Sequence, residues 1–552
     1  MGAPTVSWDP PGPGTWELDT THFDPMSSRI VRDIVSESMD AGLATGLEML
    51  GAPLASMRAA FVNGRMYVRL VPLVGADRNL PLPPKPLLWL MTRIHPEFRR
   101  RAKRSVVAID ERIWRAEYER WEQEWKPRLV STNRGLGSVD ERSLDDDALA
   151  DHLDAVIEHL RWSTTMHFRL HTSDLGPISR LLVAAEDWQL DQRAAMAALA
   201  GASPSTSAPT RSLAAIRDEL GRAGVAPNSL DDVRTASVRA GELLDAYLDE
   251  YGNRLTTGYD IRDLTLGELP DIVLASILDD RERAIVNGDG ALAAVRADVP
   301  SEHLDEFDTI VEDARLLYGL RDENGPLTYQ WPAGVLRRVV LEIGGRFLEG
   351  GRIAEPDHVF DAGAAELAAL LRGGSGPSAD ELAARADVRA ANTALTPVAV
   401  LGPPLAPPPV EVLPGRMPEM MRGVLLATRL LDGDMDAVEA GGRGADDLTG
   451  TGIGSVPYRG VARVVASADE ALDRTEPGDI IVTRLTVPTY NAVLAMAGGV
   501  VTEYGGLLCH TAVIARELGI PAVVGVAGAL TEIPDGAEIE VDPVAGRVTV
   551  LA

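Results

Sequence analysis

The architecture of the C-terminal part follows from the run Gly505-Gly-Leu-Leu-Cys-His-Thr-Ala-Val-Ile-Ala-Arg-Glu-Leu-Gly-Ile-Pro-Ala-Val-Val-Gly525. The two leading glycines allow a tight turn, because glycine tolerates backbone conformations that other residues avoid. His510 then begins a segment whose apolar residues recur at helical spacing, and Gly519 is a typical helix-ending residue. An apolar stretch follows it. The run therefore predicts a turn, a helix that starts at His510, and a buried strand.

The start of this helix is suited to phosphate chemistry. The first turn of a helix has unpaired N–H groups and a partial positive charge, and both favour a bound phosphate. A neutral imidazole at this place is a nucleophile that could carry a phosphoryl group. A histidine with a purely structural role fits the same residues, so His510 alone leaves both interpretations open.

The sequence around this run alternates between strand and helix patterns. Short β-prone stretches are separated by turns, and Asp542–Gly546 is a predicted hairpin turn. The predicted strands are Gly460–Val465, Asp479–Val482, Gly499–Thr502, Ala522–Val526, Glu538–Val541 and Arg547–Val550, with a second helix near Tyr490–Ala497. This alternation predicts a small α/β domain.

The preceding part of the chain is mainly helical. Apolar residues recur at helical spacing over most of residues 105–370. Clear examples are Leu149–Leu160, Leu304–Leu317 and Ala333–Leu348. Ser143 and Asp146 form a capping-box pattern before the first of these. Residues 202–210 are rich in Ser, Thr and Pro, and they predict an exposed loop.

Composition marks the domain boundaries. Residues 396–418 contain eight prolines, which is typical of an extended, semi-rigid linker. A short helix near 419–431 and a glycine-rich segment at 441–454 follow. We therefore predict a multidomain α+β protein. Its parts are a large mainly α-helical domain over 1–395 with a β-hairpin at Asn63-Gly64, a linker over 396–450, and the α/β domain over 451–552.

The overall composition narrows the classes of partner. The 552 residues are 45% hydrophobic and 24% charged, which is ordinary for a globular protein. The net charge of -29 argues against nucleic acid or an anionic membrane as the main partner. There is no signal-peptide pattern and no apolar run of about 18 residues. The lone Cys509 cannot form an internal disulfide, so we expect a cytoplasmic protein.

The basic residues are almost all arginine. Of the 53 basic residues only Lys85, Lys103 and Lys126 are lysines. The sequence therefore has no Gly-Lys-Ser/Thr phosphate loop and no lysine near His510. Any phosphate bound there must contact arginine, whose planar fork suits it. A GC-rich genome is the alternative explanation for the composition itself.

The stretch Thr502–Val523 resembles the swivelling phosphohistidine domain of the PEP-utilising enzymes. The resemblance extends from Gly454 to the C-terminus and includes Pro477-Gly478-Asp479 and Ala497-Gly498-Gly499. It implies that His510 takes a phosphoryl group from a nucleotide and passes it to a second substrate. The residues implied to surround the phosphoryl group are Gly505, Gly506, Thr511 and Arg516. An ion pair within the fold is an equal alternative for Arg516.

A second resemblance concerns the helical part. Residues 314–321 and 341–360, together with Trp16–Pro25, resemble the acceptor domain of rifampin phosphotransferases. The resemblance implies a catalytic role for Arg321, although Gly325 stands where a lysine would follow in that group. An ordinary helix-end cation is the alternative for Arg321. Arg315 is a lesser candidate.

The sequence contains no segment that resembles a pyruvate-binding barrel or an ATP-grasp domain. The resemblance therefore implies a two-component enzyme, most similar to phenylphosphate synthase or the p-cresol phosphate synthase of actinobacteria. A partner ATP-grasp subunit would bind most of the ATP and Mg²⁺, a small phenol would accept the phosphoryl group, and AMP and phosphate would be co-products. The alternatives are an antibiotic (rifamycin-like) phosphotransferase subunit and a non-catalytic phosphocarrier.

Two further features are weaker. His167 and His171 are four residues apart and share a helix face, without an evident third metal ligand. A buried pair and a base that deprotonates an acceptor hydroxyl both fit them. The nearby Trp162 is a core residue or part of an aromatic pocket. The basic run 99–104 is a solvated face or a docking site for an acidic partner.

Overall fold

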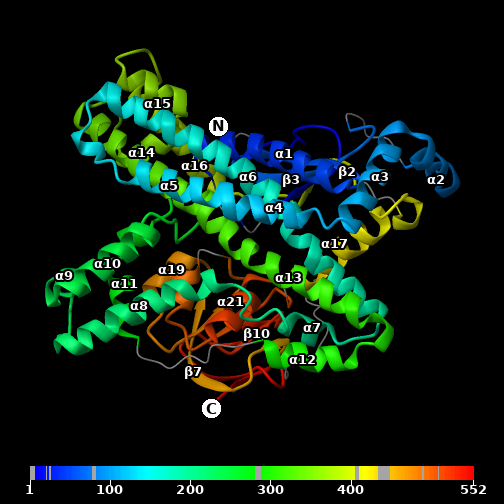
Figure 1. Cartoon of the computed structure of the whole chain (residues 1–552). Helices are drawn as coiled ribbons and strands as arrows, with labels where there is room; N and C mark the ends of the chain where they lie inside the picture. Colours follow the sequence, from blue (N-terminus) through cyan, green and yellow to red (C-terminus); the bar gives the residue numbers. More distant parts are fainter. Residues whose placement is uncertain are drawn as a thin grey trace. The chain divides into compact units, whose positions relative to one another are not determined.

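The computed structural model describes residues 6–19, 22–23, 27–76, 82–279, 288–404, 409–432, 448–487, 490–507 and 509–551. The chain divides into two compact units (Figure 1). Unit 1 comprises Met1–Ser173, Tyr259–Asp263 and Asn324–Met421. Unit 2 comprises Asp174–Gly258, Leu264–Glu323 and Arg422–Ala552. Helices α6 (Asp146–Asp187) and α13 (Leu304–Gly325) contribute residues to both units.

Unit 1 contains a four-stranded sheet in the order β2-β3-β1-β4. Its strands are β1 (Trp16–Leu18), β2 (Leu54–Val62), β3 (Arg65–Pro72) and β4 (Val400–Leu401). The predicted hairpin at Asn63-Gly64 is confirmed, and both residues have the positive φ that a tight hairpin turn requires. Strand β4 lies within the predicted linker, where it pairs with β1, and Trp16, Tyr67 and Leu401 form a small core there.

Helices form the rest of unit 1. They are α1 (Arg29–Leu50), α2 (Lys85–Ile94), α3 (Pro96–Asp110), α4 (Trp114–Arg120), α5 (Lys126–Gly137), α14 (Trp331–Glu349), α15 (Ala364–Leu371) and α16 (Ala379–Thr393). Helix α14 matches the helix predicted over 333–348. The largest fully buried side chains of unit 1 include Trp114, Trp121 and Trp331. Helix α17 (Met417–Asp432), which spans the boundary of the units, confirms the predicted helix near 419–431.

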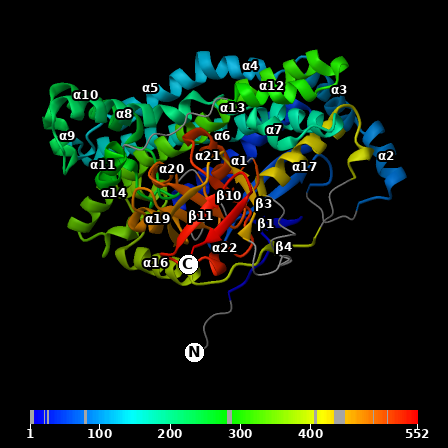
Figure 2. The same ribbon diagram turned by 90° about the horizontal axis from the view of Figure 1, so that it is seen from below.

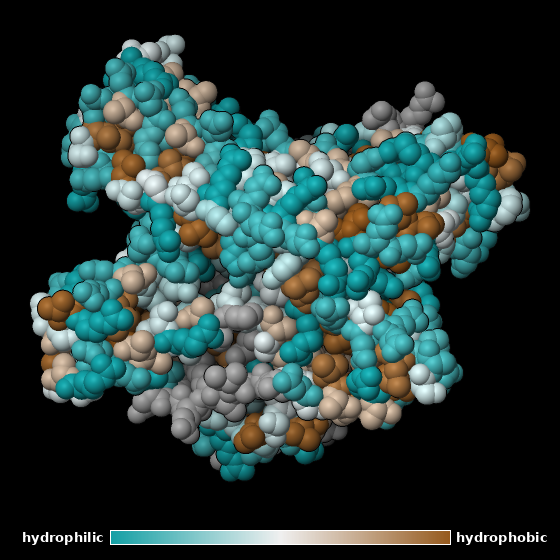
Figure 3. Space-filling model, in the orientation of Figure 1, coloured by the Kyte–Doolittle hydropathy of each residue, from teal (hydrophilic) through white to brown (hydrophobic). Residues whose placement is uncertain are grey.

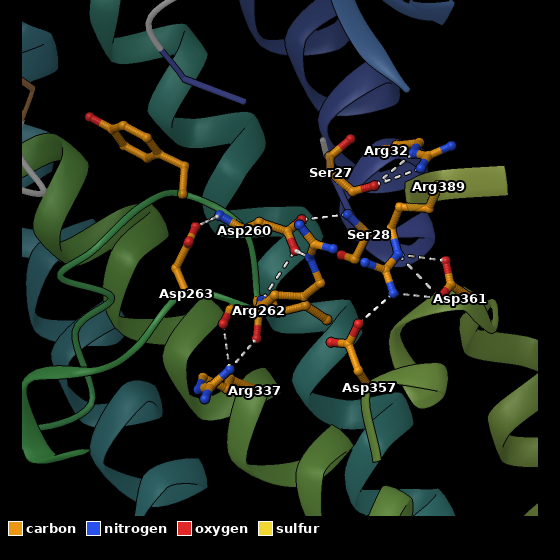
Figure 4. A network of polar contacts seen from close by, with 12 residues as sticks. Ser27, Ser28, Arg32, Asp260, Arg262, Asp263, Arg337, Asp357, Asp361 and Arg389 are labelled. Atoms are coloured by element: carbon orange, nitrogen blue, oxygen red, sulfur yellow. Dashed lines mark hydrogen bonds and ion pairs between the residues drawn. The ribbon is translucent and has the colours of Figure 1, made fainter. Parts of the chain in front are cut away.

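A buried polar network holds the segment Tyr259–Asp263 in unit 1 (Figure 4). The Asp260 carboxylate accepts a hydrogen bond of 2.6 Å from the backbone N–H of Ser28 at the start of α1. Arg337 donates to the carbonyls of Ile261 and Arg262 at 3.0 and 2.9 Å. A carboxylate at the positive end of a helix is stabilising, so the network fixes both α1 and this segment.

The start of α6 differs from the prediction. Asp145, not Ser143, caps the helix, because its carboxylate accepts a 2.9 Å hydrogen bond from the backbone N–H of Ala148. The Ser143 hydroxyl donates instead to the carbonyl of Asp140 at 2.7 Å, within a short 3-10 turn. Asp145 directly precedes the first helical residue and is charged, and it therefore makes the better cap.

The predicted loop over 202–210 is wrong, because helix α8 (Pro204–Ala223) begins there. Proline is well tolerated in the first helical turn, where backbone N–H groups have no intrahelical partner. Pro209 is accommodated inside the helix. The other helices of unit 2 before the C-terminal sheet are α7 (Gln192–Ala197), α9 (Leu230–Ala236), α10 (Val238–Tyr251), α11 (Pro270–Leu278) and α12 (Asp289–Asp298).

The C-terminal part of unit 2 is an eight-stranded sheet in the order β5-β12-β11-β7-β8-β9-β10-β6 (Figure 2). Its strands are β5 (Leu448–Thr449), β6 (Thr451–Ile453), β7 (Tyr458–Val465), β8 (Ile480–Thr483), β9 (Gly499–Thr502), β10 (Ala522–Val524), β11 (Glu538–Asp542) and β12 (Arg547–Val550). Strands β7 to β10 are parallel neighbours. The predicted strands and the hairpin between β11 and β12 are confirmed.

Both faces of the parallel strands are buried. Ile481 and Val500 face one core, which includes helices α19 (Ala468–Arg474), α20 (Asn491–Leu494) and α21 (His510–Leu518). Ile480 and Val501 face the opposite core with α22 (Ala529–Glu532). Alternating residues of a strand point to opposite faces, so continuous apolar runs are expected where both faces are covered.

Helix α21 also packs on the helices of unit 2. Val513 belongs to the core that α6, α7 and α13 form there, with Phe307 and Tyr318 from α13. Leu269 and Ile272, the latter on α11, pack against the core beside the sheet. The C-terminal α/β part and the helical part of unit 2 therefore pack together through apolar side chains at two places, one of which is on the helix that carries His510.

Apolar side chains are exposed on α2 (Figure 3). Trp89 and Ile94 are 47% and 61% exposed. The following basic run 99–104 is partly neutralised, because Arg100 and Arg101 form ion pairs with Glu48 and Glu97. A docking role for this run stays a prediction.

Among the described residues, no helix combines the length and the apolar character needed to cross a membrane.

Candidate functional site

The turn before His510 has the predicted geometry. Gly505 has a φ of 122°, and Cys509 is the extended N-cap residue of α21. The helix begins at His510 and ends at Leu518, and its C-cap Gly519 has a φ of 66°. The backbone N–H of Cys509 donates to the carbonyl of Gly506 at 3.1 Å, which closes the turn. The imidazole is therefore placed at the positive end of a helix.

The buried side of the His510 ring contacts two threonines. Nδ1 lies 2.8 Å from the hydroxyl of Thr486, and this hydroxyl lies 2.7 Å from that of Thr511. Thr486 and Thr511 are only 4% and 1% exposed. The Nδ1 edge is thus anchored in the protein interior, and Thr511 acts on His510 through Thr486.

The other ring nitrogen faces the surface. Nε2 of His510 lies 2.8 Å from Oδ1 of Asn491, an exposed residue at the start of α20. Thr486 and Asn491 were not predicted from the sequence. Only the order of the strands could have indicated them. Strands β8 and β9 are parallel neighbours, so the loops after them meet at one edge of the sheet. Thr486 and Asn491 follow β8, and His510 follows β9.

Arg321 lies close enough to His510 to affect its charge. Burial lowers the pKa of His510 to about 3, and the positive charge of Arg321 adds to this effect. Nη1 of Arg321 is buried and has no hydrogen-bond partner among the described residues. An unpartnered buried donor is costly unless an acceptor binds it. The structure thus brings together the two residues predicted to be catalytic, a neutral histidine and an arginine available to an anion.

The low pKa leads to a prediction about pH. His510 should remain neutral from pH 8 down to about pH 4, since its pKa is about 3 instead of 6.5. The unfolded chain takes up this proton at higher pH than the folded chain, so His510 should contribute to a loss of stability as pH falls from 6.5 towards 3. A histidine-labelled NMR titration measures the pKa. A midpoint near 6.5 for His510 would contradict the prediction, and the His510→Gln variant assigns the signal.

Arg516 joins its helix to the preceding turn. Its Nη2 donates to the carbonyl of Leu507 at 2.7 Å, and the residue is 8% exposed. Nη1 is buried and has no partner among the described residues. The observed contact supports the shape of the turn. A phosphate contact of Arg516 stays a prediction.

The conformation of Gly505 leads to a prediction about the turn. A Cβ atom at Gly505 would lie 2.9 Å from Sγ of Cys509, at a φ that is strained for any other residue. Gly505→Ala should lower the free energy of unfolding by about 1–3 kcal/mol. Thermal unfolding measures this effect.

Gly135→Ala in α5 is the control for this change. A Cβ atom there meets nothing within 4 Å, and alanine favours a helix, so this variant should be neutral or slightly stabilising. If both variants keep the wild-type stability, the strain assigned to Gly505 is refuted.

Arg315 has other contacts. Its Nη1 donates to the carbonyl of Ala198 at 2.5 Å, and Nη2 lies 3.5 Å from a carboxylate oxygen of Asp289. It therefore ties α13 to the region of α7 and α12. A catalytic role for Arg315 is not tested by these contacts.

The two histidines of α6 belong to unit 1. The predicted shared face of His167 and His171 is confirmed, with their Nε2 atoms 3.0 Å apart. His167 Nδ1 lies 3.1 Å from the hydroxyl of Thr328, and burial together with His171 keeps the pKa of His167 well below its usual value. His167 is therefore neutral at pH 7.

A cluster of aromatic residues begins at His167, and most of its members were not predicted from the sequence. Tyr329 lies 6.5 Å from His167 between ring centroids, and it is 6.2 Å from Tyr259. His22 packs against Tyr259 at 5.2 Å and lies 2.9 Å from an Asp19 carboxylate oxygen. These residues come from distant segments, so only the resemblance around His22-Phe23 pointed to this region.

Trp162 lies elsewhere on α6. Its ring is 5.8 Å from that of His159 and stacks with the guanidinium of Arg128, 4.1 Å from the ring centroid.

Among the described residues, no group of three or more His, Cys, Asp or Glu side chains could hold a metal ion.

Comparison with known proteins assigns the C-terminal fold. Residues 475–546 match the family model of the PEP-utilising enzyme, mobile domain. This part of the chain is thus similar to that domain, and His510 with its turn lies inside the matched region.

Several relatives share this region. A phosphoenolpyruvate synthase of Deinococcus radiodurans is 43% identical over 107 residues, which cover 19% of this chain and 14% of the relative. A rifampicin phosphotransferase of Bacillus cereus is also 43% identical over 107 residues, or 12% of its length. A rifampicin phosphotransferase of Streptomyces sviceus is 29% identical over 331 residues, which cover 57% of this chain and 35% of the relative. The chain therefore spans about a third or less of these relatives.

Proposed function

We propose that this protein is a subunit of an ATP-dependent phosphotransferase and that His510 carries the phosphoryl group. The observation that carries this proposal is the neutral His510 at the start of α21 within the electrostatic range of Arg321, whose buried Nη1 has no hydrogen-bond partner in the part of the chain that the structure describes. The mobile-domain match and the rifampicin phosphotransferase relatives support it.

The geometry favours Nε2 of His510 as the nitrogen that is phosphorylated. Nδ1 faces the buried hydroxyl of Thr486, where a phosphoryl group has no room, whereas the partner of Nε2 is exposed. In the first half-reaction the Nε2 lone pair forms a bond to phosphorus as the donor oxygen leaves. In the second half-reaction an acceptor hydroxyl forms the new P–O bond, loses its proton, and Nε2 leaves. Arg321 would stabilise the charge on the transferring group in each half-reaction.

We further propose that a separate ATP-grasp subunit binds ATP and Mg²⁺. The sequence has no Gly-Lys-Ser/Thr loop, and the described residues have no acidic metal cluster. The dikinase stoichiometry of the related enzymes implies AMP and phosphate as co-products. The mobile domain would then move between its donor and its acceptor.

The acceptor is proposed to be a small phenol. Tyr329 near His167, together with Tyr259 next to Tyr329, suits a flat aromatic ring. The Streptomyces relative supports a second candidate, a rifamycin-type drug, because that alignment covers 57% of this chain. The two acceptors differ greatly in size, so one assay can separate them.

The test uses the full chain with an ATP-grasp protein encoded beside it. AMP release is measured with a panel of phenols and with rifampicin, and acid-labile phosphate on the chain is measured without acceptor. The proposal expects acid-labile phosphate on wild type, and AMP release that depends on one acceptor class. Phosphate that remains on a His510→Ala variant would refute the assignment of His510. AMP release with rifampicin but with none of the phenols would refute the phenol as acceptor and favour a rifamycin-type drug.

A further inference from the structure

Both nitrogens of the His510 ring already have hydrogen-bond partners. Thr486 holds Nδ1 and Asn491 holds Nε2, each at 2.8 Å. A neutral imidazole carries one proton, so one nitrogen donates and the other accepts. The nitrogen that attacks phosphorus must have a free lone pair. The contacts of His510 therefore determine whether Nε2 can act as a nucleophile.

The two partners differ in the tautomers that they allow. The Thr486 hydroxyl can donate to Nδ1 or accept from it, and its contact with the Thr511 hydroxyl can run in either direction. The hydroxyl pair thus serves both tautomers. Asn491 presents a carbonyl oxygen, Oδ1, which only accepts hydrogen bonds. This contact requires a proton on Nε2. A protonated Nε2 has no free lone pair with which to attack phosphorus.

We propose that Asn491 holds His510 in a resting tautomer with its proton on Nε2, and that displacement of Asn491 releases the nucleophile. The inference rests on the proposed function, since it concerns the same phosphoryl acceptor. Asn491 is a positioning residue here. It is exposed and begins the four-residue helix α20, so its side chain can leave without breaking a core contact.

The proposed activation keeps the proton count constant. The Nε2 proton is lost to solvent as Nδ1 takes one up, and Nδ1–H then donates to the Thr486 hydroxyl oxygen. The Thr486 hydroxyl turns to donate to Thr511. Nε2 now has its lone pair exposed and forms the bond to phosphorus as the P–O bond to the donor breaks and the donor oxygen leaves, while Nδ1 keeps its proton. Binding of the phosphoryl donor would displace Asn491, which limits phosphorylation to times when a donor is present.

The first test measures the tautomer directly and requires neither ATP nor a partner. Protonated and unprotonated imidazole nitrogens have well-separated 15N resonances, and the His510→Gln variant identifies those of His510 among the nine histidines. The wild type should show the proton on Nε2, and Asn491→Ala should shift the population towards Nδ1. A wild type with its proton on Nδ1, as an Asn491 amide rotated to donate would give, overturns the proposal.

The second test measures reactivity with phosphoramidate, a small phosphorylating agent. Nε2 forms the bond to phosphorus, the P–N bond breaks, and ammonia leaves. Asn491→Ala should react about fivefold faster, the change expected for one neutral hydrogen bond. Asn491→Asp should react about tenfold slower, because a carboxylate holds the Nε2 proton more strongly. Asn228→Ala, an exposed asparagine before α9, is the matched control and should react like wild type.

Opposite changes for alanine and aspartate are the signature of tautomer control. A merely structural role would slow both variants, and either this result or equal rates overturns the proposal. Failure of the phosphotransferase proposal gives a different pattern, in which ATP and any ATP-grasp partner leave His510 unmodified while the 15N and phosphoramidate results hold. The two proposals can therefore fail separately.

Discussion

Replacing His510 with glutamine is expected to reduce phosphoryl transfer by a factor on the order of 10⁴ or more, as loss of a covalent nucleophile does in other enzymes. Glutamine keeps a polar side chain at the start of α21 but has no nitrogen lone pair that can attack phosphorus. The measurements are AMP release and acid-labile phosphate on the chain, with ATP, the ATP-grasp partner and an acceptor present.

The same variant controls for folding. The His510 contacts that glutamine can lose are with Thr486 and Asn491, so its circular dichroism and melting curve should stay close to wild type. AMP release that persists at the wild-type rate would show that phosphate does not pass through His510. Loss of activity together with loss of folding would leave the nucleophile undecided, and His510→Asn then serves as a second variant.

The fold around His510 could be predicted because its signals are local. Gly505 and Gly519 mark the two ends of the segment, and their positive φ values show why glycine is needed there. The apolar runs of the parallel strands are continuous because both faces are buried. Each signal lies within a few residues of the element that it predicts.

The partners of His510 could not be predicted in this way. Thr486 and Asn491 lie 24 and 19 residues away in sequence, and their contacts depend on the pairing of β8 with β9. Strand order is a property of the whole sheet, and the residues between these strands do not encode it by spacing. Arg321 was found only through resemblance, because nothing local links a residue of α13 to α21.

Local competition explains the two errors in the helical part. Ser143 has a good capping pattern, but the neighbouring Asp145 is closer to the first turn and charged. Pro204 reads as a loop residue, yet in the first turn of a helix it has no hydrogen bond to lose. Serine occurs both at helix caps and in turns, and proline occurs both in loops and in the first turn of helices. At each of these places the prediction chose the wrong one of the two.

Arg321→Ala is expected to slow phosphoryl transfer by about 10²–10³, the usual effect of removing one preorganised donor to a developing negative charge. The buried Nη1 of Arg321 has no partner among the described residues, so it is available to a phosphoryl oxygen. The variant should also raise the pKa of His510, because the charge of Arg321 lowers it. Single-turnover transfer from phosphorylated His510 and the NMR titration measure the two effects.

Arg321→Lys separates charge from geometry. Lysine keeps the positive charge, so the pKa of His510 should stay low, but it lacks the planar fork that holds a phosphate by two N–H groups. Transfer should therefore fall between wild type and Arg321→Ala. Arg315→Ala is the control on the same helix, because Arg315 contacts Ala198 and Asp289 instead. If Arg315→Ala impairs transfer as strongly as Arg321→Ala at unchanged stability, the assignment of the phosphate-binding arginine is wrong. If Arg321→Lys shifts the pKa of His510 as much as alanine does, the effect of Arg321 on His510 is not one of charge.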